Sequence, residues 1–483
     1  MREIAGYLRE KYGPWGWMGQ RAHDACGINR VLPLDFIISC DYGTDVPYYF
    51  REDDVFSVEK ERGIRKDWSN EDLGASFKGA LGRGILERWN SYGKTVNLLC
   101  YRSVKRLESS TGALVRRPRI YAMPEMLKKH FDNKILLQRT LPKLSLSRVP
   151  GKVDKLGKVT FNGLRKELSL PFVVQFPYGS SGHFTFIIRE EKDYNRLRRN
   201  YPGSMVVIRK YVDGFSLNVN GVIISTEDGP RVACSFPSVQ ITGAPECSNF
   251  PSAFCGNDYT AARDLDRKII RQVQDHVRAI GEWMAEARFR GVFGMDFVVG
   301  NGTVYPVEIN PRFQNSTSLH AALTGISRSR RGMLFLLHIA EFLQRNDKTM
   351  RRYVREFPFE ELMRPLNGSQ VILHNRMQRS IVTERLEPGV YRPEGRGLKL
   401  VRKGASLDAC RNADDVLVTC GVPGPYMAIE PNAPVCKIQM RRSALEGTGK
   451  RKLSPGIRKV VSDIYDKFGI KDANKVEMAE ERA

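Results

Sequence analysis

Short apolar runs alternate with polar or helix-like stretches through the first quarter of the chain. Residues 36–40, 55–58 and 96–100 are the clearest of these runs. Strands of a parallel sheet are covered on both faces, so they read as continuous apolar segments separated by helices. The pattern therefore predicts an open α/β domain over residues 1–120.

The spacing of apolar positions changes in the middle of the chain. Residues 265–284 carry an apolar stripe with helical period, which indicates an amphipathic helix packed on a core. Just before it, residues 243–258 are rich in Gly, Pro, Ser and Asn and predict a long loop. Long loops inside a domain are often functional, so a substrate-side loop is one interpretation.

After residue 362 the chain consists of short β-rich segments separated by Gly and Pro, which favours an appended β-domain. We expect strands at residues 370–374, 380–383, 398–401, 416–419 and 427–429. An amphipathic helix follows and is predicted to end near Gly469, a residue type that commonly closes helices. The charged residues 471–483 are expected to fray.

Residues 291–312 combine a hairpin pattern with candidate chemistry. Two strand-like segments flank a Gly-Asn-Gly turn, with Asp296 on the first and Glu308 and Asn310 on the second. Glu308 and Asn310 are two apart, so their side chains share a face. If Asp296 joins them, two carboxylates and an amide oxygen converge as Mg²⁺ requires. Arg312 then lies just past the metal, where its fork of donors could hold a phosphoryl group.

The length of the hairpin loop decides whether Asp296 reaches that face. A two-residue loop pairs Asp296 with Val307 and puts it on the wrong face. A three-residue loop at 300–302 pairs it with Pro306, on the same face as Glu308. We therefore predict an odd-length loop or a β-bulge. An ordinary buried hairpin is the alternative interpretation.

Two upstream segments have the character of a nucleotide site. Residues 171–188 run from an apolar strand through a Gly-Ser-Ser-Gly loop into a second strand, and consecutive N–H groups in such a loop can form a phosphate nest. A Walker loop is excluded, because no Gly-Lys-Ser/Thr follows. Residues 206–220 predict a strand, a turn at Gly214 and another strand. Each segment alone is also compatible with a plain turn.

The pattern G-x-F-G-x-D-F…V-E-I-N-P-R resembles the magnesium-binding signature of the ATP-grasp superfamily. The order of the glycine-rich lid, the hinge at 206–220 and the metal hairpin is similar to that of the family, and the resemblance covers roughly residues 120–330. It implies an α/β (α+β) ATP-grasp fold, with an N-terminal domain at 1–120, a lid subdomain at 121–205, a metal and nucleotide subdomain at 206–362 and a C-terminal β-rich domain with a terminal helix at 363–483.

The resemblance also implies roles for individual residues. ATP would be bound by Lys134, Gln175, Gly179, Ser180, Ser181, Gly182, Lys210, Tyr211, Val212 and Asp213. Mg²⁺, or Mn²⁺ in its place, would be bound by Asp296, Glu308 and Asn310. Catalytic stabilisation of the transferring phosphoryl group would come from Arg312, Ser181 and Gly182. Substrate contacts would come from Gln314, Asn315, Ser316, His183 and Asn218.

The chain departs from the family pattern at Gln175. Many relatives have a second phosphate-binding lysine there, whereas Gln donates a hydrogen bond without supplying charge. Other cations must then offset the triphosphate, and we name Lys134, Arg209, Lys210 and Arg312 as candidates. Some peptide-ligase branches tolerate this change, notably those resembling the ligase of pheganomycin biosynthesis.

The family's chemistry implies an ATP-dependent carboxylate–amine ligase that forms an amide or peptide bond through an acyl phosphate and releases ADP and phosphate. Its partners would be a small-molecule carboxylate and an amine, amino acid or peptide. In one interpretation of the basic net charge, the substrate carries acidic groups of its own. Two alternatives within the superfamily are an ATP-dependent carboxylase and a non-catalytic nucleotide-binding protein. A homodimer is compatible with each of them.

Composition narrows the alternatives. A net charge of +23 allows binding of nucleic acid, acidic peptides or ATP, but no recognition helix, RNP strand or zinc finger accompanies it, so a nucleic-acid partner is not expected. The nine cysteines lack metal-ligand spacing and fit a reduced cytoplasmic protein. The sequence shows neither a signal-peptide core nor an apolar run long enough for a bilayer, so no membrane partner is expected.

Overall fold

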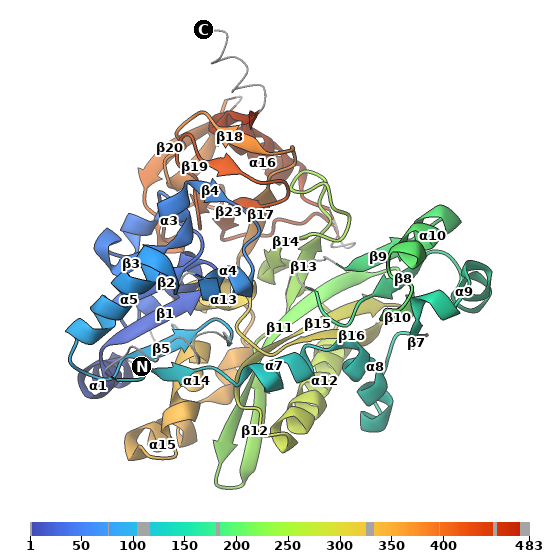
Figure 1. The fold of residues 1–483 in the computed structure, drawn as a ribbon, viewed down its shortest axis with the longest axis horizontal. Coiled ribbons are helices and arrows are strands. Elements are labelled where there is room, and N and C mark those ends of the chain that lie inside the picture. The colour runs from blue at the N-terminus through green and yellow to red at the C-terminus, as the bar shows by residue number, and fades with distance from the viewer. Residues whose placement is uncertain are drawn as a thin grey trace.

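The computed structural model describes residues 2–75, 77–103, 116–179, 184–324, 333–395, 397–447 and 452–473. Its N-terminal part, its lid and its C-terminal part are arranged around one long antiparallel sheet (Figure 1). The fold is mixed α/β, as the sequence predicts. None of the described helices is both long enough and apolar enough to cross a bilayer.

The N-terminal part is a parallel sheet, as its apolar runs predict. The strand order is β3 (Val55–Ser57), β2 (Phe36–Ser39), β1 (Trp15–Gly19), β5 (Asn97–Cys100) and β6 (Arg119–Tyr121), with every pairing parallel. Alternate residues serve two cores: Trp17 packs on one face and Met18 on the other. Helices α1 (Arg2–Tyr12), α2 (Cys26–Asn29), α3 (Val58–Arg62), α4 (Asn70–Ala75) and α5 (Gly79–Ser91) accompany these strands.

The lid is a four-stranded antiparallel sheet with helices on one face. Its order is β7 (Gly151–Lys155), β10 (Met205–Lys210), β8 (Phe172–Gln175) and β9 (Thr185–Ile188). Helices α9 (Phe161–Leu168) and α10 (Glu191–Asn200) share a core with Phe172 and Val174. Because strand side chains alternate, Val173 and Gln175 face the opposite side. Helices α7 (Glu125–Phe131) and α8 (Lys134–Thr140) precede the lid.

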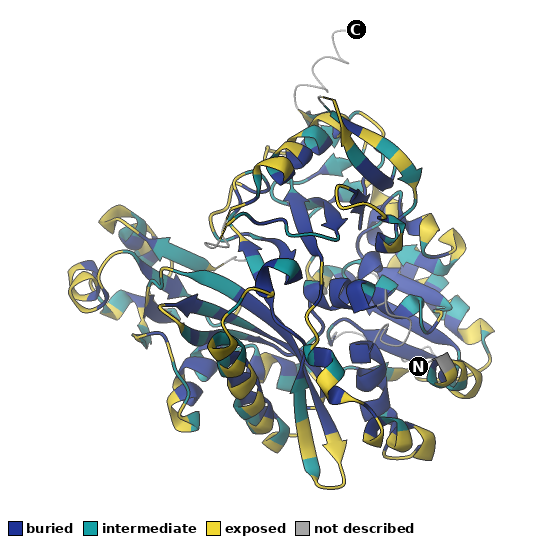
Figure 2. Ribbon diagram, turned by 180° about the vertical axis from the view of Figure 1, so that it is seen from behind, coloured by how far each residue is buried: buried dark blue, intermediate teal, exposed yellow. Residues whose placement is uncertain are grey.

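The central sheet carries the predicted hairpin. It contains β11 (Phe215–Thr226), β12 (Gly229–Cys234), β13 (Ser238–Thr242), β14 (Phe254–Asp258), β15 (Gly291–Gly300) and β16 (Thr303–Asn310). Helix α12 (Arg267–Glu286) is the predicted amphipathic helix, and it packs against β11, β12 and β16. Leu217 and Met295 lie in the core on that side, while Asn218 and Asp296 face the lid. Figure 2 shows burial concentrated in the sheets and exposure on the outer helices.

The predicted loop at 243–258 is shorter than expected. Its last residues form β14, which pairs with β13 and with β17 (Ser369–His374). The physical reason is that Gly256, with φ of 138°, lets the chain pass close to the backbone of Gln370, where a side chain would collide. A Gly-rich composition therefore concealed a strand. Residues 243–253 remain a loop between the strands.

The C-terminal part continues the central sheet. From β14 the order runs through β17, β23 (Pro434–Met440), β21 (Val416–Thr419), β19 (Gly389–Glu394) and β20 (Gly397–Lys403). One sheet thus crosses the predicted boundary at 362/363, and the division into four domains stays a prediction. A second sheet contains β24 (Ile470–Asp472), β18 (Ser380–Val382), β22 (Ala428–Ile429) and, from the N-terminal part, β4 (Ile64–Arg65).

The expected β-segments of the C-terminal part are confirmed by β17, β18, β20, β21 and β22. The terminal helix α16 (Pro455–Phe468) ends at Gly469 in the left-handed conformation, also as predicted. The expected fraying from 471 is wrong for its first residues, because Lys471 and Asp472 pair with β18. Residues 474–483 lie outside the described part. The remaining helices are α11 (Tyr259–Ala262), α13 (Asn315–Thr324), α14 (Met333–Leu343) and α15 (Lys348–Arg355).

Candidate active site

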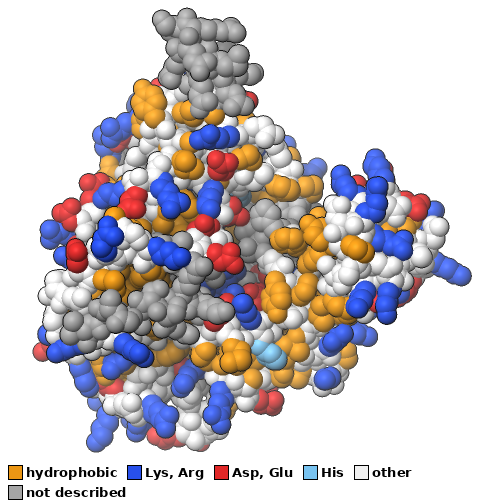
Figure 3. Space-filling model, in the orientation of Figure 1, with side chains coloured by type: hydrophobic (Ala, Val, Ile, Leu, Met, Phe, Trp, Pro, Cys, Tyr) orange, Lys and Arg blue, Asp and Glu red, His pale blue; other side chains and the backbone are white. Residues whose placement is uncertain are grey.

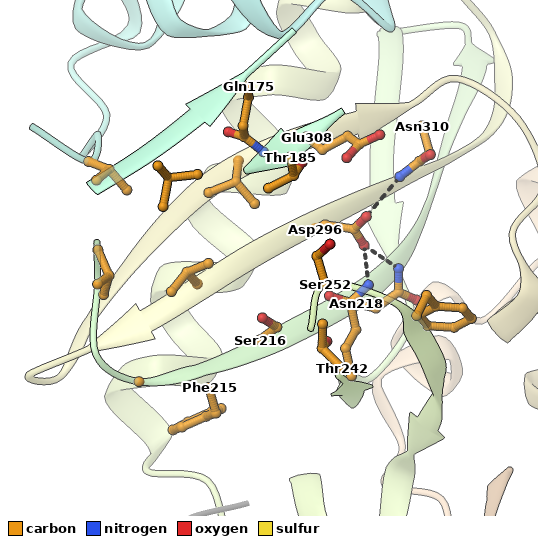
Figure 4. Close-up of a pocket in the computed structure, with 18 of the residues that line it drawn as sticks. Gln175, Thr185, Phe215, Ser216, Asn218, Thr242, Ser252, Asp296, Glu308 and Asn310 are labelled. Atoms are coloured by element: carbon orange, nitrogen blue, oxygen red, sulfur yellow. Dashed lines mark hydrogen bonds between the residues drawn. The ribbon is translucent and has the colours of Figure 1, made fainter. Parts of the chain in front are cut away.

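A cavity of about 410 Å³ lies between the lid sheet and the central sheet (Figure 4). Volumes of this size are typical of small-molecule sites. The lining changes along β15: Val298 is apolar, and Asp296, two residues away on the same face of the strand, is polar. Further apolar side chains come from Val149, Val173, Ile187 and Val212. The cavity can therefore hold a ligand with one flat apolar end and one charged end.

A β-bulge brings the two predicted carboxylates together. Gly300 pairs with Thr303 across a two-residue loop, so the three-residue loop considered above is wrong. The register shifts between Phe297, which pairs with Pro306, and Asp296, which pairs with Glu308. Val307 is the extra residue. The prediction of a bulge is confirmed, and Asp296 and Glu308 both line the cavity.

Asp296 is embedded in amide donors. The side-chain amide nitrogens of Asn218 and Gln240 donate to its Oδ1 at 2.6 and 2.9 Å, and that of Asn310 donates to Oδ2 at 3.0 Å. Burial, reinforced by the charge of Glu308, raises the pKa of Asp296 to about 7. Two adjacent carboxylates with an amide oxygen nearby form a donor set that fits a hard divalent cation.

Lys134 also lies at this hairpin, and its contact with ATP stays a prediction. Its Nζ is 3.1 Å from Oε1 of Glu308 and donates to the carbonyl of Gly179 at 3.3 Å. Asn133 caps helix α8 and so fixes the backbone of this lysine. A buried cation therefore links the hairpin of Asp296 and Glu308 to Gly179, at the start of the Gly-rich loop.

Arg209 lies beside Gln175, the position where the chain departs from the family. Its Nη1 donates to Oε1 of Gln175 at 3.0 Å and to the carbonyl of the bulged Val307 at 3.5 Å. Its side chain is buried, and its Nε and Nη2 find no hydrogen-bond acceptor in the described part of the chain. Burial lowers the pKa of Arg209 to about 10, so it stays charged at neutral pH. In the sequence analysis, Arg209 is only one of four cations expected to offset the charge of the triphosphate.

Arg312 is held by residues of two different parts. Its Nη2 donates to Oδ1 of Asn310 at 2.8 Å, and its Nη1 donates to the hydroxyl of Tyr101 at 3.3 Å. Tyr101 and Arg102 directly follow β5, and Arg102 donates to Oε1 of Gln20 at 3.0 Å. The carboxyl ends of parallel strands are the usual place for ligands in α/β sheets. Sequence reasoning missed Tyr101, although polar residues directly after a buried run were a usable signal.

The predicted substrate residues form a buried network around Asn218. Its Nδ2 donates to Oε1 of Gln314 at 2.6 Å, and its Oδ1 accepts from the hydroxyl of Ser316 at 2.5 Å. Asn315 instead connects distant parts, because its Oδ1 accepts from Arg21 at 2.7 Å and from Lys437 at 3.2 Å. Gln314, Asn315, Ser316 and Asn218 all line the cavity.

The hinge is only partly at the cavity. Lys210, Tyr211 and Val212 line it, whereas Asp213 is exposed and Gly179 is likewise not among the lining residues. The lid residues Ser180, Ser181, Gly182 and His183 lie outside the described residues, so their roles stay predictions.

Other metal chemistry has less support in the described ranges. No three His, Cys, Asp or Glu side chains cluster there, and the nine cysteines are all unpaired. The donor set of two carboxylates and one amide is therefore the candidate metal centre.

The fold and the cavity can be compared with those of known proteins. Residues 131–316 match the family model described as an ATP-grasp domain. The match covers 186 of the 483 residues, and this part of the chain is therefore similar to ATP-grasp domains.

The individual relatives are distant. The carbamoyl phosphate synthase large chain of Thermoanaerobacter sp. (strain X514) is 26% identical over 166 residues, which is 33% of this chain and 14% of that protein. The chain therefore spans a small part of the length of this curated relative.

Two solved structures are similar over most of the chain. Biotin carboxylase of Campylobacter jejuni, solved as a complex with β-γ-ATP, has a TM-score of 0.53 and 13% identity, covering 89% of this chain and 87% of that one. Phosphoribosylamine–glycine ligase of Thermotoga maritima has a TM-score of 0.51 and 11% identity, covering 95% and 97%. Likeness at this identity shows the fold alone.

Proposed function

We propose that this protein is an ATP-dependent carboxylate–amine ligase that forms an amide or peptide bond and releases ADP and phosphate. The observation that carries the proposal is the direct pairing of Asp296 with Glu308 at the polar end of the cavity, ringed by Lys134, Arg209 and Arg312. Such an end suits a metal-bound triphosphate, because its carboxylates hold the cation and its cations face the phosphates.

ATP is proposed to bind with its base at the apolar end of the cavity and its phosphates at the polar end. The adenine would lie among the apolar side chains near Val212 and Val298, against the backbone of the hinge at Lys210. Asp296, Glu308 and Asn310 would hold Mg²⁺ or Mn²⁺, which when bound neutralises the triphosphate and orients it for in-line transfer.

The reaction needs two bond exchanges. A carboxylate oxygen of the acid attacks the γ-phosphorus, the bond from that phosphorus to the bridging oxygen breaks, and ADP leaves with an acyl phosphate formed. The amine nitrogen then attacks the carbonyl carbon, the carbon–oxygen bond to phosphate breaks, and the nitrogen loses a proton. Arg312, with the lid amides of residues 180–182, would stabilise charge on the transferring group.

A carboxylase is the second candidate, supported by the fold it shares with biotin carboxylase. Both activities can be tested in one screen. The full chain is incubated with MgATP and a library of acids, with hydroxylamine as a small universal amine, and ADP, phosphate and hydroxamates are measured. Acid-dependent hydroxamate with matching ADP supports the ligase. Turnover that needs bicarbonate and no other acid would assign the carboxylase.

A variant pair ties turnover to the site. Glu308→Gln removes one charge from the metal centre and should lower ADP release by orders of magnitude while the protein stays folded. Glu282→Gln, at an exposed position of α12, is the matched control and should keep full activity. Full activity in Glu308→Gln, or AMP in place of ADP, would overturn the proposal. No turnover with any acid would favour a nucleotide-binding protein without catalysis.

A further inference from the structure

A second cavity of about 610 Å³ adjoins the ATP cavity. Its walls come from β9 and α10 of the lid, from the loop at 243–253, and from His374, Asn432 and Pro434 of the C-terminal part. Arg21 and Asp67 of the N-terminal part complete it. The lid and the loop at 243–253 therefore contribute to both cavities, and the described residues of the N-terminal and C-terminal parts line only the second.

The two cavities meet along β9 and the loop at 243–253. Thr185, Ile187, Pro251 and Ser252 line both. The Thr185 hydroxyl accepts from the side-chain amide of Gln175 at 3.3 Å, and Figure 4 shows Thr185 beside Glu308 and Ser252 beside Asp296. A ligand in the second cavity would thus reach the place where an acyl phosphate forms.

The apolar side of the second cavity is aromatic. Its lining includes Phe184, Phe186, Tyr201 and Phe250, and the rings of Phe184 and Phe250 are 47% and 43% exposed. The ring of Phe176 packs against the three aromatic rings that the lid contributes. Its centroid lies 5.6 Å from that of Phe184, 6.0 Å from that of Phe186 and 5.1 Å from that of Tyr201. Exposed aromatic rings grouped around a cavity indicate a ligand with an apolar body.

The charged side of the cavity favours an anionic group on the same ligand. Arg189, Arg196 and Arg21 contribute guanidinium groups, against the carboxylates of Asp67 and Asp193. Arg196 is 3.3 Å from Asp193, whereas Arg189 makes no hydrogen bond or ion pair with a described residue. An unengaged guanidinium matches a carboxylate with two parallel hydrogen bonds. Figure 3 shows hydrophobic side chains on the edge of the lid that faces the rest of the molecule, and Lys and Arg on its outer edge.

We propose that this second cavity binds the amine substrate, and that this substrate is an amino acid or short peptide with a large apolar side chain and a free carboxylate. The inference rests on the proposed ligase. The aromatic rings hold the apolar side chain, Arg189 holds the carboxylate, and the amino group points through the gap between Thr185 and Ser252 toward the acyl phosphate. The C-terminal part then has a function, because it forms one wall of the amine site.

A binding experiment tests the chemistry without turnover. The full chain with MgADP is titrated calorimetrically with L-leucyl-L-phenylalanine, with the same dipeptide as its C-terminal carboxamide, and with L-alanyl-L-alanine. We expect the first to bind at least tenfold more tightly than either of the others. Arg189→Gln should abolish the preference for the carboxylate, and Phe250→Ala should abolish the preference for the large side chains. Arg199→Gln, exposed on α10 and outside the lining, is the matched control and should keep both preferences.

Equal affinity for the three peptides, or variants with undiminished preferences, would overturn the inference. This failure differs from a failure of the proposed function. Hydroxamate formation without any dipeptide preference would leave the ligase and remove the amine site. Selective dipeptide binding without hydroxamate formation would leave the cavity assignment and remove the ligase chemistry.

Discussion

The guanidinium of Arg209 and the side-chain amide of Gln175 meet at 3.0 Å from adjacent strands of the lid sheet. Arg209 thus supplies a positive charge to the cavity next to Gln175, the neutral residue at the position where many relatives have a lysine. Two further nitrogens of Arg209 are buried and unpaired with any described residue, which is a costly arrangement unless an acceptor such as phosphate completes it.

Replacing Arg209 should therefore weaken ATP binding. We expect Arg209→Met to raise the Kd for MgATP about tenfold or more, since one charge-assisted contact contributes roughly 1.5–3 kcal/mol. Arg271→Met, exposed on α12, is the control and should bind as the wild type does. Isothermal titration measures both.

A second substitution tests whether the affinity lost in Arg209→Met is due to the missing charge or to altered packing. Gln175→Lys in the Arg209→Met background returns a cation to the same region and should recover much of the lost affinity. If Arg209→Met binds MgATP normally, the triphosphate is neutralised without this arginine, and the compensation argument fails.

The sequence predicts those features of the fold that depend on residues close together in the chain. The hairpin, the strands β8 and β9 on either side of the Gly-rich loop, and α12 depend on local period and turn chemistry. The structure has each of them where the sequence predicts it. The bulge at Val307 was predictable only by requiring Asp296 and Glu308 to share a face. The loop length was not predictable, because the hydrophobic pattern allowed both registers.

Contacts between distant segments could not be predicted. Asn315 accepts from Arg21 and Lys437, which are 294 and 122 residues away. Tyr101 contacts Arg312 across 211 residues. No local pattern encodes such contacts, since they depend on how the N-terminal and C-terminal parts pack on the central sheet. The single sheet across residue 362 was missed for the same reason, because β14 was hidden in a loop-like composition.

The two hydrogen bonds of Arg312 to Asn310 and Tyr101 use both arms of its guanidinium. Arg312→Lys keeps the charge and removes that planar geometry. We expect kcat for ADP release to fall about 100-fold and the KM for ATP to change less than threefold, since a contact to the transferring group acts chiefly in the transition state. Steady-state kinetics at saturating acid give both. A rise in KM with unchanged kcat would instead assign Arg312 to ground-state binding.

The metal hairpin also depends on its turn. Asn301 and Gly302 have φ of 49° and 73°, a left-handed pair that L side chains adopt only with strain. Gly302→Ala should lower the free energy of unfolding by about 1 kcal/mol in urea titrations. The cost is conformational, because a methyl group there would touch nothing.

Gly203 offers the matched control for this turn. Its position is equally open and outside the left-handed region, so Gly203→Ala should leave the free energy of unfolding within about 0.5 kcal/mol of the wild type. Equal stability of the two variants would show that the turn tolerates an L side chain.

Buried His338 should make the stability depend on pH. Its Nδ1 accepts from the backbone N–H of Val292 at 3.0 Å, and its Nε2 donates to the carbonyl of Tyr121 at 3.1 Å. Burial lowers its pKa to about 4 from an ordinary value of 6.5. Because the unfolded chain binds the proton more readily, His338 costs nothing above pH 6.5 and destabilises the fold as the pH falls from 6.5 toward 4.

The size of this effect follows from the two pKa values. Between pH 7.5 and 5 the loss amounts to about 2 kcal/mol for this histidine. The buried carboxylates Asp41 and Asp296, with pKa values raised to about 7, act in the opposite direction and together outweigh the histidine over this range in the wild type. The test is therefore a difference between proteins, because those carboxylates contribute to both.

His338→Gln removes the titrating group. We expect it to be less stable than the wild type at pH 7.5, where two hydrogen bonds are disturbed, and to approach the wild type by about 2 kcal/mol at pH 5. Arg271→Met at an exposed position of α12, which removes no histidine, is the control and should show the same difference from the wild type at each pH. Urea titrations at pH 7.5, 6.5, 5.5 and 5 measure the differences. A constant offset for His338→Gln as well would mean that His338 protonates equally in the folded and unfolded chains.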